Sequence, residues 1–509
     1  MKLNKFHLLG LVLLVIITGS LLSGFVFSLG NKEGVQSLNQ GNQEFLCKAL
    51  PKKPPSARDV EVGYYANSNN MKPQENLNLD NYWLPFTANK NFKANPRLLT
   101  SANGMYYKTD DGKDVLDGIA GLWCTNAGHC HPKIVAAVQN QVAELDYATA
   151  FNMSHPKAFE LAERISALTP DGLDRIFYGN SGSEAVETAL KVALAYHASK
   201  GEGQRTKFIG REKGYHGVNF GGVSVGGITP NRKSFGPLLP GVDHLPHTWD
   251  PNHMAFSKGQ PEWGLHLADE LEKILMLQDP STVAAVIIEP VVGSGGVIVP
   301  PKGYLERIRE ICDKHHILLI FDEVITGFGR LGDAFAANRF KVKPDMITMA
   351  KGLTSAMIPM SAVAFDNSIY DQLMEGSETP IELFHGYTYS GHPVACAAGI
   401  ATLDVYEEEG LFENAQKMEP VFEEALHSIK GSNQVIDVRN IGLMGAVHFG
   451  SDKIPATELA PKVFQHCYDN DVLVRFSADY LVISPSLIVE PSQIERIAEA
   501  IKVAIKSVS

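Results

Sequence analysis

The chain has 509 residues, which is enough for a large hydrophobic core and for two domains. Apolar residues make up 44% and charged residues 20%, as in ordinary globular proteins. The 45 lysines and arginines are outnumbered by 57 acidic residues, and no basic run stands out, which excludes a nucleic-acid-binding surface. The six cysteines follow no framework spacing, so we expect reduced and mostly packed thiols.

The N-terminus differs from the rest of the chain. Lys2 and Lys5 precede a nearly uncharged stretch at residues 6–29. Its length of about 24 residues suits a membrane anchor, while a signal peptide is the alternative. More basic residues follow the stretch than precede it, which favours a cytoplasmic position for the remaining chain. Residues 31–70 are polar and predict a linker, and folded character begins near Leu77.

A phosphate-binding turn is predicted where a strand meets a helix. A hairpin at residues 105–117 and helices at 132–145 and 155–168 come first. A short strand at 175–178 then leads through Asn180-Ser181-Gly182-Ser183-Glu184 into a helix at 184–200. Free N–H groups and serine hydroxyls at a helix start favour an anion. The alternative is a plain helix cap with Ser183 as the capping residue.

Three apolar runs each end in one polar residue. The runs at 283–288, 317–321 and 346–350 are followed by Glu289, Asp322 and Lys351. With a helix at 303–315 between the first two, they predict parallel strands whose carboxyl ends meet in one crevice. An amine beside carboxylates there suits Schiff-base chemistry on pyridoxal 5'-phosphate (PLP), whose ring nitrogen takes a carboxylate partner. Each residue alone would be a surface lysine or a strand-end cap.

Other candidates depend on these strand ends. Tyr215, in the loop Tyr215-His216-Gly217, suits stacking on a flat ring, although ordinary loop packing is the alternative. Glu323 follows Asp322 and should face away from it. Arg475, after an apolar strand at 472–474, suits binding a substrate carboxylate, with a surface ion pair as the alternative. His129-Cys130-His131 lacks the spacing of a zinc site, so we treat it as loop sequence and predict no metal.

The last part of the chain mixes helices and strands. We expect helices at 393–409, 460–470 and 491–507, and strands at 434–439, 444–449 and 480–484. The whole is therefore an α/β protein.

A set of motifs spans the chain from about Met71 to the C-terminus. They are Leu84-Pro85-Phe86-Thr87-Ala88-Asn89, Gly121-Leu122-Trp123-Cys124, Gly182-Ser183-Glu184-Ala185, Tyr215-His216-Gly217, Glu289-Pro290-Val291, Asp322-Glu323-Val324-Ile325-Thr326-Gly327-Phe328-Gly329-Arg330, Ala350-Lys351-Gly352-Leu353, His385-Gly386-Tyr387-Thr388-Tyr389-Ser390-Gly391-His392-Pro393 and Val474-Arg475-Phe476. With these motifs the chain resembles the class III aminotransferases of PLP fold type I, most closely the β-alanine–pyruvate (ω-amino acid) group.

The resemblance implies a role for each site residue. Lys351 would form the Schiff base with PLP, and Asp322 would pair with the ring nitrogen. The remaining cofactor contacts would be made by Ser181, Gly182 and Ser183 at the phosphate, Thr388 at the phosphate from a neighbouring subunit, Tyr215 and Val324 on the two ring faces, His216 beside Tyr215, and Glu289 near the ring hydroxyl. The substrate pocket would be shaped by Phe86, Trp123 and Arg475.

The same resemblance implies a large PLP-binding domain with a mainly parallel sheet and a smaller α+β domain. The parts would be a hydrophobic segment at 1–30, a linker at 31–70, small-domain parts at 71–120 and 400–509, and the large domain at 121–399. The protein would be a homodimer, and some relatives are tetramers. It would move an ω-amino group to pyruvate. The sequence does not decide among β-alanine, putrescine, γ-aminobutyrate and taurine as the donor. The acceptor could also be 2-oxoglutarate instead of pyruvate.

Two other functions are alternatives to transamination. A second PLP reaction, such as decarboxylation or an aminomutase shift, would keep the same residues. A membrane-tethered scaffold on a degenerate enzyme fold would not need them. Lys351, Asp322 and the phosphate turn are all present, which favours an enzyme.

Overall fold

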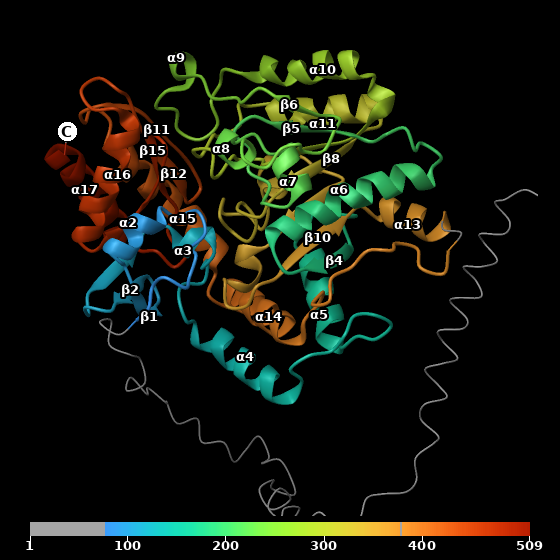
Figure 1. Ribbon diagram of the computed structural model, residues 1–509, viewed down its shortest axis with the longest axis horizontal. Helices are drawn as coiled ribbons and strands as arrows, with labels where there is room; N and C mark the ends of the chain where they lie inside the picture. The colour runs from blue at the N-terminus through green and yellow to red at the C-terminus, as the bar shows by residue number, and fades with distance from the viewer. Residues whose placement is uncertain (1–76, 377–378, 509) are drawn as a thin grey trace, which may run out of the picture. The chain divides into compact units, whose positions relative to one another are not determined.

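The computed structural model describes residues 77–376 and 379–508 (Figure 1). The predicted hydrophobic segment at 6–29 and the whole predicted linker at 31–70 lie outside these ranges. Within them, no helix combines the length and the apolar character needed to cross a bilayer.

Seven strands form the central sheet, in the order β4-β10-β9-β8-β7-β5-β6. Their bounds are β4 (Arg175–Gly179), β5 (Lys207–Arg211), β6 (Val242–Leu245), β7 (Val283–Ile288), β8 (Leu318–Asp322), β9 (Met346–Met349) and β10 (Ser361–Phe365). The five strands from β9 to β6 are parallel, while β10 runs antiparallel to both of its neighbours. The predicted mainly parallel sheet is thus confirmed.

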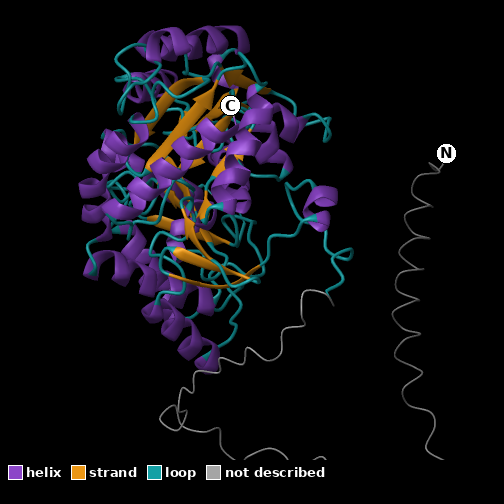
Figure 2. Ribbon diagram, turned by 90° about the vertical axis from the view of Figure 1, so that its left-hand side faces the viewer, coloured by secondary structure: helices purple, strands orange, loops and turns teal. Residues whose placement is uncertain are grey.

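Helices cover both faces of this sheet, as Figure 2 shows. Neighbouring residues of one strand point to opposite faces. Val286 of β7 packs in one buried cluster with Ile308 of α11 (Tyr304–His315). The next residue, Ile287, packs in another cluster with Ala189 of α6 (Gly182–Ser199). Burial on both faces explains why β7 and β8 are continuously apolar rather than alternating.

The other helices largely follow the predicted pattern. They are α2 (Asn89–Ala94), α3 (Ala120–Trp123), α4 (Pro132–Glu144), α5 (Pro156–Ser166), α7 (Phe220–Val225), α8 (Thr229–Arg232), α9 (Pro251–Met254), α10 (Glu270–Gln278), α12 (Ala336–Phe340), α13 (Asn367–Glu375), α14 (Pro393–Glu408), α15 (Leu411–His427), α16 (Ala456–Asp469) and α17 (Pro491–Val508). α16 starts four residues before the predicted start at 460, because it tolerates Pro461 in its interior and buries Ala456 and Leu459.

Two four-stranded sheets complete the fold. One contains β1 (Leu99–Asn103), β2 (Tyr106–Thr109), β3 (Asp114–Asp117) and β13 (Val472–Leu473); the other contains β11 (Val435–Ile441), β12 (Met444–Phe449), β15 (Tyr480–Ile483) and β14 (Arg475–Ser477). The strand predicted at 472–474 is present as β13 over two of its three residues, and a separate strand, β14, begins at once after it and pairs in the other sheet. Arg475 is therefore the first residue of a new strand.

The pairing of β3 with β13 joins segments more than 350 positions apart in the sequence. Leu473 lies opposite Asp117, and Gly118 N donates to Leu473 O at 2.9 Å. A Cβ on Gly118 would lie 2.8 Å from that carbonyl oxygen, so glycine is required by this close approach.

We expect Gly118→Ala to lower the free energy of unfolding by about 1–3 kcal/mol, because the added methyl group must push β3 away from β13. Thermal unfolding measures the change. Gly203→Ala is the matched control, since nothing lies within 4 Å of its Cβ position. Equal stability of the two variants would contradict the close packing of the junction.

Candidate active site

Three polar residues stand at the ends of three neighbouring strands of the central sheet. Glu289 follows β7, Asp322 ends β8, and Lys351 follows β9 and opens the 3₁₀ turn η4 (Lys351–Thr354). The strands are parallel neighbours, so their carboxyl ends share one edge. The charge of Lys351 interacts there with Asp322 and Glu289. The structure thus brings the predicted strand-end residues together.

Asp322 is buried and receives three hydrogen bonds. The Nδ1 atom of His216 lies 2.7 Å from its Oδ2, while Val324 N and Thr348 Oγ1 donate to Oδ1 at 3.2 and 3.1 Å. Because a carboxylate only accepts, His216 donates from Nδ1. The three donors come from separate segments and fix the orientation of the carboxylate. His216 is therefore placed directly against Asp322.

Glu323 faces the other way, as predicted. Its carboxylate accepts from Ala336 N and Ala337 N at 2.5 and 2.9 Å, at the start of α12. Burial raises the pKa of Glu323 to about 7. This residue caps a helix and lies outside the crevice.

Glu289 connects the sheet edge to the loop that carries Tyr215. Its Oε1 accepts from Tyr215 N at 2.9 Å, and its Oε2 accepts from Gly293 N at 2.8 Å. Arg211, at the end of β5, donates to the carbonyl oxygen of Glu289 at 2.5 Å. Burial raises the pKa of the Glu289 carboxyl above its usual range.

Lys351 combines a strained backbone with a perturbed amine. Its φ of 46° lies in the left-handed region, which costs energy in a residue with a side chain. Burial lowers the pKa of Lys351, while Cys124, Asp322 and Glu289 act in the opposite direction. A lowered pKa increases the share of neutral amine, which is the nucleophilic and basic form.

The helix start of α6 has the features of an anion site. Ser181 is the capping residue and accepts from Glu184 N at 3.3 Å, so the alternative that Ser183 caps the helix is wrong. Ser183 instead accepts from Val218 N at 3.1 Å, beside the loop of Tyr215. A Cβ on Gly182 would lie 2.9 Å from Val324 Cγ1. The structure thus places the predicted phosphate turn next to Val324, two residues after Asp322.

The predicted substrate residues lie at different depths. Trp123 is buried, Arg475 is half-buried and Phe86 is 75% exposed. Burial lowers the pKa of Arg475, and its charge interacts with Tyr480 and Tyr215. The predicted partner-site residue, Thr388, is exposed, and its carbonyl oxygen accepts from Tyr147 Oη at 2.9 Å.

Three residues that support the site were not predicted from the sequence. Thr348 and Arg211 hold Asp322 and Glu289, and Asp117 receives hydrogen bonds at the end of β3. Asp117 carried a usable signal, since it ends a predicted strand just as Asp322 does. Thr348 stands within a predicted strand and Arg211 lies in β5 of the structure, and nothing in the sequence marks either residue before the neighbours of its strand are known.

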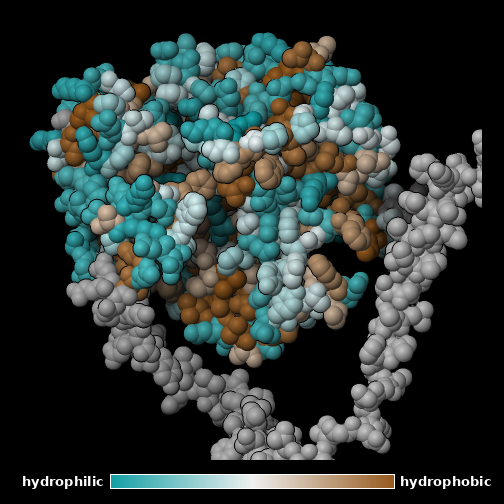
Figure 3. Space-filling view, viewed as in Figure 1, coloured by the Kyte–Doolittle hydropathy of each residue, from teal (hydrophilic) through white to brown (hydrophobic). Residues whose placement is uncertain are grey.

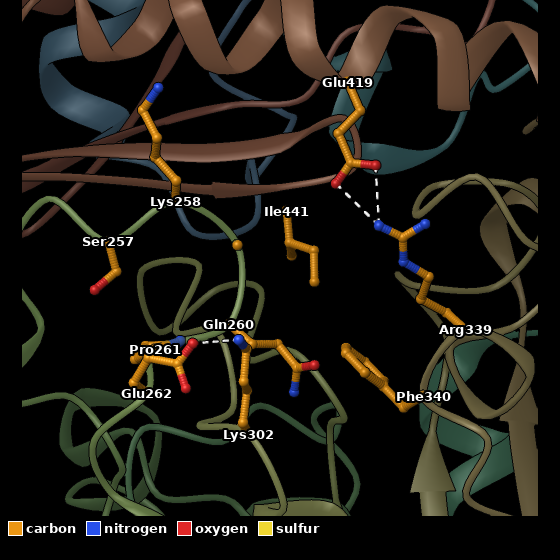
Figure 4. A pocket seen from close by; sticks show the side chains of 11 residues that line it. Ser257, Lys258, Gln260, Pro261, Glu262, Lys302, Arg339, Phe340, Glu419 and Ile441 are labelled. Atoms are coloured by element: carbon orange, nitrogen blue, oxygen red, sulfur yellow. Dashed lines mark hydrogen bonds and ion pairs between the residues drawn. The ribbon is translucent and has the colours of Figure 1, made fainter.

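A separate cavity of about 380 Å³ has none of these residues in its lining (Figure 4). Its charged side chains form ion pairs, and Lys258 pairs with Glu423, which lies outside the lining. Arg339 contacts Glu419 at 3.1 Å, and Lys302 contacts Glu262. The paired charges do not point to a ligand.

The sequence matches the Aminotransferase class-III family over residues 87–505. The chain belongs to the class III aminotransferases. It is 57% identical to an omega-aminotransferase of Caulobacter vibrioides, over 83% of this chain and 97% of that protein. It is 46% identical to a beta-alanine–pyruvate aminotransferase of Pseudomonas aeruginosa, over 85% of this chain and 97% of that protein.

Solved structures agree with this family. An (S)-enantioselective omega-transaminase from Thermomicrobium roseum matches with a TM-score of 0.81 and 34% identity, over 84% of this chain and 97% of that one. An amine transaminase from an uncultivated Pseudomonas species, solved with PLP bound, matches with a TM-score of 0.78 and 36% identity, over 84% and 99%. The class III aminotransferases depend on PLP, and the sheet-edge residues of this chain fit that cofactor.

We expect Lys351→Ala to abolish turnover and to remove the visible absorbance band of the PLP-loaded protein, because Lys351 supplies the amine that we assign to the Schiff base. Absorbance spectra and a turnover assay measure both effects. Lys341→Ala, at an exposed lysine, is the control. Substantial turnover of Lys351→Ala would show that the assignment is wrong.

Proposed function

We propose that this aminotransferase moves the amino group of β-alanine or a similar ω-amino compound to pyruvate, giving L-alanine and an oxo product such as 3-oxopropanoate. One observation carries the proposal: Lys351, Asp322 and Glu289 stand at three adjacent strand ends, where Lys351 and the half-buried Arg475 interact electrostatically. The names of the two relatives with 57% and 46% identity support the choice of substrates.

The cofactor would be held by residues from four segments. Ser181, Gly182 and Ser183 would bind the phosphate, where free N–H groups of α6 favour an anion. Tyr215 and Val324 would pack on the two faces of the ring, and Glu289, which holds Tyr215 N, would lie near the ring hydroxyl. The bound cofactor supplies an aldehyde that takes up the amine and a ring that withdraws electrons.

Three residues of the chain would do the chemical work. The Lys351 amine would remove a proton from the donor carbon that bears the nitrogen, and it would deliver that proton to the cofactor carbon bonded to the same nitrogen. Its lowered pKa suits a base, because a neutral amine accepts protons. The Asp322 carboxylate holds the proton on the ring nitrogen, and His216 keeps that carboxylate in place. Arg475 binds the carboxylate of pyruvate.

The resemblance supports a homodimer in which Thr388 reaches the phosphate of the neighbouring site. Large apolar side chains near it in sequence are exposed, with Phe384 at 90% and Tyr389 at 58%. Figure 3 shows apolar patches on one face of the molecule. A second copy that covers Phe384 and Tyr389 would bury apolar surface and complete each site.

The domain division belongs to the same proposal. The seven strands of the central sheet fall within 121–399, and the β3–β13 pair joins 71–120 to 400–509. These pairings support a large domain and a small domain built from both ends of the chain. A cytoplasmic position remains an expectation from the charges around 6–29.

A panel of amine donors with pyruvate and with 2-oxoglutarate tests the function. The panel contains β-alanine, putrescine, γ-aminobutyrate and taurine. We expect alanine to form from pyruvate with β-alanine as a good donor. Failure of every donor to produce alanine, or release of carbon dioxide without alanine, would overturn the proposal.

We expect Arg475→Ala to raise KM for pyruvate by about 10- to 100-fold, since a charge-assisted hydrogen-bonded pair contributes about 1.5–3 kcal/mol. KM for an amine donor without a carboxylate should change little. Steady-state kinetics with both substrates measure the difference. Arg307→Ala, at a surface ion pair with Asp269, is the control. An equal effect on both substrates would contradict the role of Arg475.

A further inference from the structure

The turn that follows β3 has an unusual backbone. Ala120, Gly121 and Trp123 have φ values of 48°, 69° and 64°. The left-handed region is rare for alanine and rarer for a bulky residue such as tryptophan. Backbone of this kind persists only where its surroundings hold it, and it is common at functional sites. The contacts of this turn are therefore informative.

One buried carboxylate, that of Asp117, holds the turn. Ile119 N donates to its Oδ1 at 2.9 Å, and Gly121 N donates to its Oδ2 at 2.5 Å. His129 Nε2 lies 2.8 Å from the same Oδ2. Asp117 is fully buried and His129 is 8% exposed. The Asp117 carboxylate thus accepts hydrogen bonds from the backbone on both sides of Ala120.

His129 is itself held from two directions. Its backbone exchanges hydrogen bonds with Gly104, at 2.8 and 3.0 Å. The Tyr107 ring lies 4.2 Å from the His129 ring, centroid to centroid. The histidine that we treated as loop sequence is therefore a fixed donor to Asp117. The neighbouring His131 bonds a different carboxylate, Glu409, at 2.8 Å.

The residues that follow the turn pack against the segment that begins with Lys351. Asn126 lies so close to Gly352 that a Cβ there would be 2.6 Å from Asn126 Nδ2. Ala127 N donates to Ser355 Oγ at 3.1 Å, at the end of the Lys351 turn. The chain after Trp123 is thus packed along the segment that begins with Lys351.

The turn also adjoins the strand pair that carries Arg475. Trp123 packs in a buried cluster with Tyr480 and Val482. Val482 is the partner of Arg475 across the β14–β15 pair. Trp123 is therefore fixed between the surroundings of Lys351 and those of Arg475.

We propose that Asp117 and His129 are positioning residues that determine donor selectivity by holding the Ala120–Trp123 turn in this conformation, with positive φ at three of its four residues. The inference rests on the proposed function in that Trp123 is taken to border the amine donor. Without the carboxylate and its histidine, the turn relaxes to common backbone angles, and Trp123 moves. Lys351 follows β9, which is held between β8 and β10 in the central sheet, so we expect the cofactor to stay bound.

The test uses the PLP-loaded full chain with Asp117→Asn and His129→Gln. Asp117→Asn keeps the shape of the side chain and removes its charge. His129→Gln replaces the ring by an amide. Asp114→Asn is the matched control, because Asp114 lies on the same strand with its side chain 65% exposed. Trp123 emission is obtained by subtracting the spectrum of each protein's Trp123→Phe version. Selectivity is the ratio of kcat/KM for 1-phenylethylamine to that for β-alanine.

We expect a red shift of Trp123 emission and a change of about fivefold or more in donor selectivity, mainly through KM, with the visible PLP band retained. Asp114→Asn should behave like the wild type. Unshifted Trp123 emission together with unchanged selectivity in a folded His129→Gln protein would overturn the proposal. If Asp117→Asn does not fold, His129→Gln alone provides the test. If the wild type used neither donor, the proposed function would fail, while the emission shift would still test the turn.

Discussion

The hydrogen bonding of the buried Asp322 carboxylate is the constraint on which the rest of the site depends. A buried charge without partners costs several kcal/mol, so its donors must be in place whenever the protein is folded. The donors come from β9, from the loop after β5 and from the backbone after β8. The strands β7, β8 and β9 are parallel neighbours. Their carboxyl ends therefore bring Glu289, Asp322 and Lys351 to one edge of the sheet.

The pairing of β3 with β13 positions the candidate substrate residues. Segments from the first and the last hundred residues of the structure's described ranges do not pair only locally: β3 pairs with β13 across more than 350 positions of sequence. Asp117 stands at this junction, and the strained turn to Trp123 follows it, while Arg475 comes two residues after Leu473. One short stretch of pairing thus positions two candidate substrate residues that are far apart in the sequence. The cofactor side and the substrate side of the site are built from different sheets.

Much of this arrangement could be predicted from the sequence, because the buried strands are continuous apolar runs and their ends are marked by Glu289, Asp322 and Lys351. The split between β13 and β14 could not, since it depends on which sheet offers a partner. The same holds for His129, whose role appears only when Asp117 lies beside it. Ser181 rather than Ser183 caps α6, a difference of half a turn that the local sequence leaves open.

The central claim is that Asp322 holds a proton on the ring nitrogen of the cofactor. The most direct measurement is the ¹⁵N chemical shift of that nitrogen in protein loaded with ring-labelled PLP. We predict the shift of a protonated ring in the wild type and that of an unprotonated ring in Asp322→Asn. An unprotonated ring in the wild type, or the same shift in both proteins, would contradict the account.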